Sequence, residues 1–188
     1  LTAFNTLLYR YTGQEDILVG SPTANRSRAE LEGLIGFFAN TIVVRTDLSG
    51  APTFTELLAR VKETTLAAYA HQETPFEKLV EELRPTRHVA ANPLVQATFA
   101  LQNTPKQLLN LTGIGAQDLN ISAGVVRPFD LHLYMVEQGS CIRGYLCYNR
   151  SLFEADAIRM LVTHLQNLLE SIVKNQDRRI TGLPMLTE

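Results

Sequence analysis

Hydrophobic and polar positions along the chain follow two periods, one typical of helices and the other of strands. Apolar residues recur three and four positions apart in four stretches, which predict helices at residues 3–12, 54–69, 75–83 and 158–172. Short apolar or alternating runs predict strands at residues 17–21, 41–45, 95–101, 119–126, 129–136 and 142–148. A helical turn is also expected within residues 30–36.

Pairs of residues with capping chemistry precede three of the expected helices. They are Thr53 with Glu56, Thr74 with Glu77, and Ser151 with Glu154. In such a pair the hydroxyl accepts a hydrogen bond from a backbone N–H, and the carboxylate reaches back to the start of the helix. We therefore expect each hydroxyl to cap its helix, with Pro75 at a first position that tolerates proline.

The order of these elements predicts an α/β sandwich, with helices packed on a sheet of about five or six strands. Residues 137–140 read as a hairpin turn, which favours a mixed sheet over a purely parallel one. The first helix has no N-cap residue before it, and we expect it to begin upstream in a longer protein. Periodicity is lost at residue 178. We therefore expect one domain at residues 1–177 and the start of a linker at residues 178–188.

Composition limits the classes of function. A formal net charge of −2 gives no electrostatic reason to expect a nucleic acid or a membrane as a partner. The apolar runs are shorter than the roughly 20 residues of a membrane span, and no signal peptide is visible. The two cysteines, Cys141 and Cys147, are six positions apart in one expected strand, too far apart for a disulfide unless that strand turns. Reduced thiols are the expectation, and they favour a cytoplasmic protein.

The four histidines lack metal-ligand spacing to other ligating residues, and no metal site is expected. The chain contains no phosphate-binding glycine loop and no nucleophile elbow. Asp130 and His132 fall on the same side of an expected strand, where a carboxylate could orient a general base. No serine or cysteine nucleophile is linked to them by a motif, so an ordinary polar strand face is the favoured alternative.

Three polar blocks stand out from ordinary core or surface sequence. The residues of interest are Gly36, Asn40, Thr41 and Arg45 in the first block, His71, Gln72, Pro75, Phe76 and Glu77 in the second, and Arg87, Asn92 and Pro93 in the third. In this order and spacing the blocks resemble the C-terminal half of a condensation domain from a nonribosomal peptide synthetase. His88 and Ala90 depart from that family's third motif.

The resemblance implies a chloramphenicol-acetyltransferase-like half-domain that forms one wall of a substrate tunnel. The named residues of the three blocks, together with Asp130 and His132, are the candidate motif and tunnel-wall residues. The family joins aminoacyl or peptidyl thioesters by amide-bond formation. Its substrates are carried on phosphopantetheine arms, and it binds no cofactor directly. Implied partners are an N-terminal condensation subdomain, donor and acceptor peptidyl carrier domains, and a following adenylation domain.

The family's catalytic motif, two adjacent histidines followed by a short spacer and Asp-Gly, is absent from this sequence, so we expect the isolated chain to be inactive. Two other functions remain open. One is a non-catalytic module of the same fold that docks a carrier or another partner. The other is a stand-alone acyltransferase that uses CoA, against which both the first block and the absent histidine motif argue.

Three structural expectations follow. Asn40 is expected to bind backbone groups that a turn leaves unpaired. Arg45, a charge at the end of an apolar strand, is expected to pair with a carboxylate, and Asp130 is the candidate. Residues 102–115, together with the strand at residues 119–126, carry leucines without periodicity; they either cross to the other half of the domain or fold as a local loop.

Overall fold

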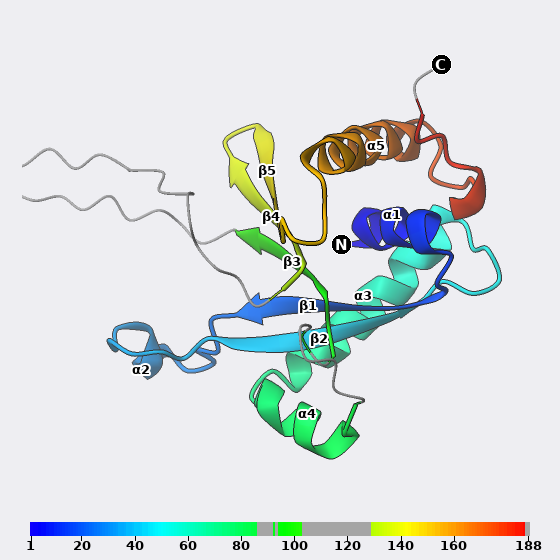
Figure 1. Cartoon of the computed structure of the whole chain (residues 1–188). Coiled ribbons are helices and arrows are strands. Elements are labelled where there is room, and N and C mark those ends of the chain that lie inside the picture. The colour runs from blue at the N-terminus through cyan, green and yellow to red at the C-terminus, as the bar shows by residue number, and fades with distance from the viewer. Residues whose placement is uncertain (86–91, 93, 103–128, 187–188) are drawn as a thin grey trace, which may run out of the picture.

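The computed structural model describes residues 1–85, 92, 94–102 and 129–186 (Figure 1). Its helices are α1 (Thr2–Thr12), α2 (Ala29–Glu32), α3 (Phe54–Ala70), α4 (Phe76–Leu83), α5 (Ala155–Lys174) and the short 3-10 helix η1 (Ile180–Gly182). Its strands are β1 (Asp16–Thr23), β2 (Asn40–Asp47), β3 (Ala97–Gln102), β4 (Leu131–Gln138) and β5 (Cys141–Tyr148). The strand expected at residues 119–126 and the segment at residues 103–115 lie outside the described residues.

The five described strands form one mixed sheet in the order β2-β1-β3-β4-β5. Strands β1 and β2 are antiparallel, as are β4 and β5, whereas β3 runs parallel to both β1 and β4. The hairpin between β4 and β5 turns at Gly139, whose φ of 60° suits a glycine. The predicted mixed α/β sandwich is confirmed.

One face of the sheet carries the hydrophobic core. Helices α1, α3 and α5 pack together on this face, where Phe4 of α1 lies 6.4 Å from Phe99 of β3 between ring centroids. The strand residues that share this face include Val19, Leu131 and Leu133. Because side chains alternate along a strand, the intervening residues project to the opposite face.

The boundaries of the helices confirm one predicted cap and correct two. Thr53 and Glu56 form the expected capping box at the start of α3. Helix α4 begins after Pro75 and α5 after Glu154, and neither has a cap hydrogen bond from its own N-cap side chain. The predicted caps from Thr74 and Ser151 are therefore wrong.

The segment after α5, which we expected to begin a linker, packs against the domain. Ile180 and Leu183 are completely or almost completely buried and belong to the core cluster. The guanidinium of Arg10 donates hydrogen bonds to the carbonyl oxygens of both residues, at 3.2 and 2.8 Å. The amide of Asn167 holds the carbonyl oxygen of Met185 at 2.8 Å. These contacts fix the described part of the tail to α1 and α5.

None of the helices in the described ranges is long and apolar enough to span a membrane. Cys141 and Cys147 both lie in β5 and are free thiols, as their spacing predicts.

Candidate functional site

Asn40 joins the first two sequence blocks. Its side-chain amide donates hydrogen bonds to the carbonyl oxygens of Gln72 and Thr74, at 2.8 and 2.7 Å. Its side-chain oxygen accepts a hydrogen bond from the N–H of Phe76 at 3.1 Å. The first residue of β2 thus supplies the cap that the local sequence pattern assigns to Thr74. The expectation that Asn40 binds unpaired backbone groups of a turn is confirmed, with that turn leading into α4.

His71 and Gln72 connect α3 to α4 through their backbone groups. His71 is the C-cap of α3, and its carbonyl oxygen accepts a hydrogen bond from the N–H of Thr74 at 3.0 Å. The N–H of Gln72 donates to the carbonyl oxygen of Tyr69 at 3.2 Å. These bonds keep the connection short and place Pro75 and Phe76 directly beside Asn40.

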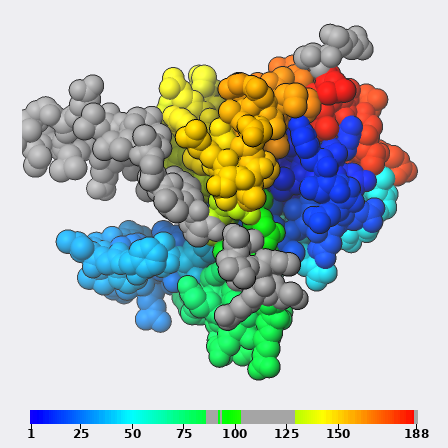
Figure 2. All heavy atoms as spheres, viewed as in Figure 1, coloured from blue at the N-terminus to red at the C-terminus, as the bar shows by residue number. Residues whose placement is uncertain are grey.

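An open cleft of about 810 Å³ lies where the sequence blocks meet. The described residues that line it are Asn25, Phe37, Ala39, Asn40, Thr41, Glu73, Pro75, Phe76, Glu77, Val80, Glu81, Asn92 and Phe129. One wall therefore comes from the segment that leads into β2 and the other from α4. In Figure 2 the α2 region projects at the lower left of the molecule and α4 at its bottom, whereas α5 lies at the top.

The third block contributes Asn92 to this cleft. The Asn92 side-chain oxygen accepts hydrogen bonds from the N–H groups of Leu94 and Val95, at 3.2 and 3.1 Å, which turns the chain into β3. Arg87 and Pro93 lie outside the described residues. Asn25 and Phe129 were missed by sequence reasoning because neither is part of a block, and only the folded chain brings them to the cleft.

The apolar face of α4 is only partly covered. Phe76, Leu79 and Val80 are half-buried, and Leu83 is 65% exposed. The apolar periodicity of this helix predicts a buried face. That prediction is wrong for a helix whose Phe76 and Val80 line an open cleft.

The segment between α2 and β2 contacts Arg26 but leaves the side chains of Ile35 and Phe37 exposed. The Arg26 guanidinium lies 4.3 Å above the Phe38 ring, and it also donates a hydrogen bond to the Leu31 carbonyl oxygen. Gly36 passes so close to Phe38 that an added Cβ would lie 2.9 Å from the ring, so a larger residue would have to displace the ring. Ile35 and Phe37 are fully or almost fully exposed.

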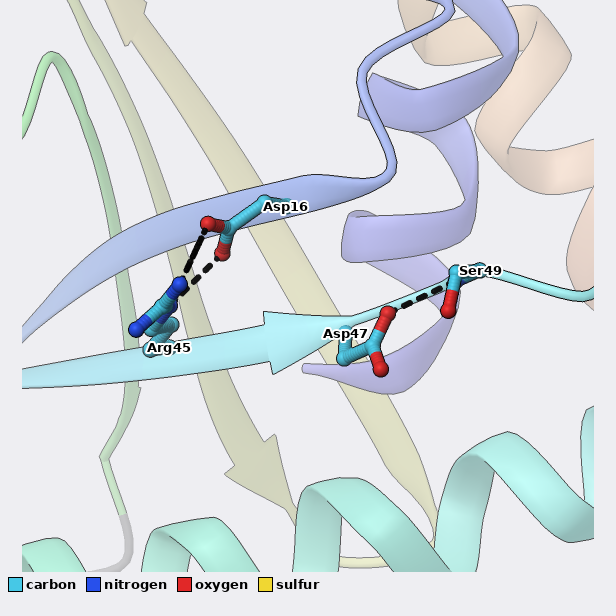
Figure 3. Close-up of polar contacts among 4 residues, drawn as sticks. All are labelled: Asp16, Arg45, Asp47 and Ser49. Carbon is cyan, nitrogen blue, oxygen red and sulfur yellow. Dashed lines mark hydrogen bonds and ion pairs between the residues drawn. The ribbon is translucent and has the colours of Figure 1, made fainter.

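Arg45 pairs with Asp16, so the predicted pairing with Asp130 is wrong (Figure 3). The two residues are diagonal neighbours on the paired strands β1 and β2, and the guanidinium contacts both carboxylate oxygens, the shorter contact being 2.8 Å. Hydrogen bonds from Arg45 lower the pKa of the Asp16 carboxyl below its ordinary value. The pair is exposed at the surface, and the carboxylate of Asp130 instead accepts a hydrogen bond from the amide of Asn149 at 3.3 Å.

His132 lies opposite Thr98 in the β3–β4 ladder and is buried. Its Nδ1 is 2.5 Å from the Thr98 hydroxyl, and its ring stacks near that of Tyr134, with centroids 6.2 Å apart. His132 and Thr98 project from the face opposite the hydrophobic core. The favoured expectation of a polar strand face agrees with this placement, although His132 is buried and not exposed to solvent.

The described residues of the site form a surface that can bind and position a ligand, and they provide few reactive groups. They include no cluster of three or more His, Cys, Asp or Glu residues arranged to hold a metal ion. The cleft brings together Asn40, Thr41, Pro75, Phe76, Glu77 and Asn92 from the three blocks. It does not include Asp130 or His132 among its described lining residues.

Comparison with known proteins gives a consistent family. A family model described as "Condensation domain" matches residues 1–188. The chain is 51% identical over 189 residues to a linear gramicidin synthase from Brevibacillus parabrevis, covering all of this chain but 4% of that protein. It is 42% identical over 187 residues to a chondramide synthase from Chondromyces crocatus, again covering all of this chain but 5% of that protein. The chain therefore spans a small part of the length of these relatives.

Solved structures also match the whole chain. The X-domain in complex with OxyB from teicoplanin biosynthesis has a TM-score of 0.82 at 30% identity, with 42% of that chain covered. Holo-AB3403, a four-domain nonribosomal peptide synthetase bound to AMP and glycine, has a TM-score of 0.83 at 26% identity, with 15% covered. The fold, the three blocks at one cleft and the family match agree: this chain belongs to the condensation domain family.

Proposed function

We propose that this chain is the C-terminal subdomain of a condensation domain and works together with an N-terminal subdomain in amide-bond formation. In this reaction the amine nitrogen of the acceptor attacks the thioester carbonyl of the donor. The C–N bond forms as the C–S bond breaks, and the amine proton passes to the leaving thiolate. This subdomain contributes by positioning the two carrier-bound substrates along one wall of a tunnel. Its substrates arrive on phosphopantetheine arms, and it needs no cofactor of its own.

The observation that carries the proposal is the exposed apolar segment ahead of β2. Leu34, Ile35 and Phe37 expose 51%, 104% and 93% of their surface within four residues of each other. Exposed apolar groups that are contiguous usually mark an interaction site, because their burial against a partner is favourable. Arg26 contacts Phe38 and Leu31 of this segment, yet the three apolar side chains stay uncovered, which fits a permanent contact with a second subdomain.

Two further observations support a half-domain. The chain covers 40–43% of three solved chains, one of an X-domain and two of the same condensation domain, while nearly all of its own length is matched. The sequence also has no pair of adjacent histidines, so the family's histidine motif must come from elsewhere if the domain is catalytic. Binding and positioning residues without a proton-transfer motif can supply only part of the catalysis.

A second candidate function is a docking module without condensation activity. The observation in its favour is the structural likeness to an X-domain that was solved in complex with OxyB. In this reading the same fold presents the segment at residues 34–37 to a separate protein.

The decisive experiment measures amide formation between two loaded carrier proteins. Three samples are compared: this chain alone, this chain fused to its natural upstream sequence, and the fused protein with Phe37→Ser. We expect turnover by the fused protein, none by the chain alone, and a strong loss in the Phe37→Ser variant because the subdomain contact is weakened. Turnover by the chain alone would refute the division of roles, and an inactive but folded fusion would favour the docking module.

A further inference from the structure

The charged side chains among the described lining residues of the cleft are all of one sign. Its described lining residues include the three glutamates Glu73, Glu77 and Glu81, and no lysine or arginine. The same lining includes four large apolar side chains, Phe37, Phe76, Val80 and Phe129. An acidic rim around apolar side chains attracts a ligand that combines positive charge with apolar groups, and it repels anions.

Glu77 is the lining glutamate whose carboxylate has no partner among the described residues. The sequence pattern assigns it to a capping box, but the cap of α4 comes from Asn40, and none of the described residues forms an ion pair or hydrogen bond with the Glu77 side chain. The other two acids are engaged. Glu73 accepts a hydrogen bond from the Ser27 hydroxyl at 2.8 Å, and Glu81 lies 3.3 Å from the ammonium group of Lys78.

The apolar side chains of the cleft are also only partly covered. Helix α4 has no fully buried residue, although it is amphipathic, and the facing Phe37 is almost fully exposed. Amphipathic helices in folded proteins normally bury their apolar face. The two walls of the cleft therefore present apolar groups that only another segment can cover.

We propose that this cleft binds a polypeptide segment of the N-terminal subdomain that carries lysine or arginine beside large apolar residues, and that it does not receive a phosphopantetheine arm. The choice of partner rests on the proposed function, because the cleft shares Phe37 with the surface assigned there to the other subdomain. The exclusion rests on charge, since the phosphate of the arm would lie against carboxylates in the cleft. In this proposal the lysine or arginine of the segment lies beside Glu77, and its apolar residues pack against Phe76 and Val80.

The test uses three fluorescent nine-residue peptides with the same leucines and phenylalanine and with three lysines, three glutamines or three glutamates. Binding to this chain is measured by fluorescence anisotropy, with free 4′-phosphopantetheine as a competitor. We expect the lysine peptide to bind at least about fivefold more tightly than the glutamine peptide, with a difference that shrinks at high salt. The glutamate peptide and 4′-phosphopantetheine are expected neither to bind nor to compete.

A variant in which the three glutamates of the cleft are replaced by glutamine tests whether the peptide binds there. It carries Glu73→Gln, Glu77→Gln and Glu81→Gln, and we expect it to bind the lysine and glutamine peptides equally. The matched control makes the same change in net charge at exposed glutamates outside the cleft lining. Its substitutions are Glu63→Gln, Glu137→Gln and Glu170→Gln. The control should bind as the unaltered chain does. Equal loss in both variants would show a non-specific charge effect and overturn the proposal.

The occupant is identified by repeating the measurement with the chain fused to its natural upstream sequence. If the N-terminal subdomain fills the cleft, the lysine peptide no longer binds to the fused protein, and a photo-crosslinker in place of Val80 reacts with a basic, apolar segment of that subdomain. Undiminished peptide binding to the fused protein would overturn the choice of partner. Competition by 4′-phosphopantetheine would overturn the exclusion of the arm. Amide formation by the fused protein is scored separately, so failure here is distinct from failure of the proposed function.

Discussion

Replacing Asn40 with alanine should release α4 from the domain without unfolding the rest. The change removes three hydrogen bonds, two to the carbonyl oxygens of Gln72 and Thr74 and one from the N–H of Phe76. A typical hydrogen bond contributes about 0.5–1.5 kcal/mol and a helix N-cap about 1 kcal/mol, so the three together contribute about 2–4 kcal/mol. Because α4 has no fully buried residue, little other packing holds it in place.

The effect should therefore be local, and amide hydrogen exchange measures it directly. A loss of about 2–4 kcal/mol raises the local opening equilibrium of α4 roughly 30- to 900-fold, with a matching loss of protection at its amides. Amides of α1 and α5, whose residues form the hydrophobic core, should keep their protection. Asn40→Asp retains the oxygen that caps α4 but places a second carboxylate oxygen against the carbonyl oxygens of Gln72 and Thr74, so its loss of protection should be at least as large as that of Asn40→Ala.

The matched control is Gln72→Ala. Asn40 binds the backbone carbonyl oxygen of Gln72 and not its side chain, so this variant should keep the protection of α4 nearly unchanged. If Gln72→Ala and Asn40→Ala cause the same loss, the Gln72 side chain carries the connection and the role given to Asn40 is wrong. A loss spread evenly over α1, α5 and α4 would show that α4 unfolds with the whole domain, which would refute the argument for local release.

Three further predictions concern stability. Ile180→Ala should lower the free energy of unfolding by about 2–5 kcal/mol in urea titrations, because it leaves a cavity in the core, whereas Leu186→Ala, at a 71% exposed side chain, should have little effect. Thr98→Val should cost about 1–3 kcal/mol in the same assay, because it leaves a buried imidazole nitrogen without its hydroxyl partner; an unchanged midpoint would show that this hydrogen bond is dispensable. Arg45→Ala should change the melting temperature at pH 7 only slightly, since the pair is exposed. The lowered pKa of Asp16 means that the pair stabilises the fold above the ordinary carboxyl pKa of 3.8 and loses this contribution as pH falls through the lowered value, so the two proteins should converge at low pH in thermal melts.

The amino-acid sequence by itself determined most of the secondary structure and the family. The helical stripe of residues 158–172 and the short strand-favouring run of residues 142–148 are local patterns, which depend only on neighbouring residues. The capping box at Thr53 was readable for the same reason, because both partners lie within one helical turn. The hairpin turn at residues 137–140 likewise needed no distant contact.

Tertiary structure decided which residues meet across long sequence separations. The cap of α4 comes from Asn40 and not from Thr74, because the start of β2 brings an amide with both donor and acceptor groups to three backbone groups at once. The partner of Arg45 is Asp16, because the antiparallel register of β1 and β2 makes the two residues diagonal neighbours. A loss of periodicity after residue 178 gave no sign that Ile180 is buried, since a single anchoring side chain produces no repeating pattern. Such contacts are set by register and packing, and a local sequence pattern contains neither.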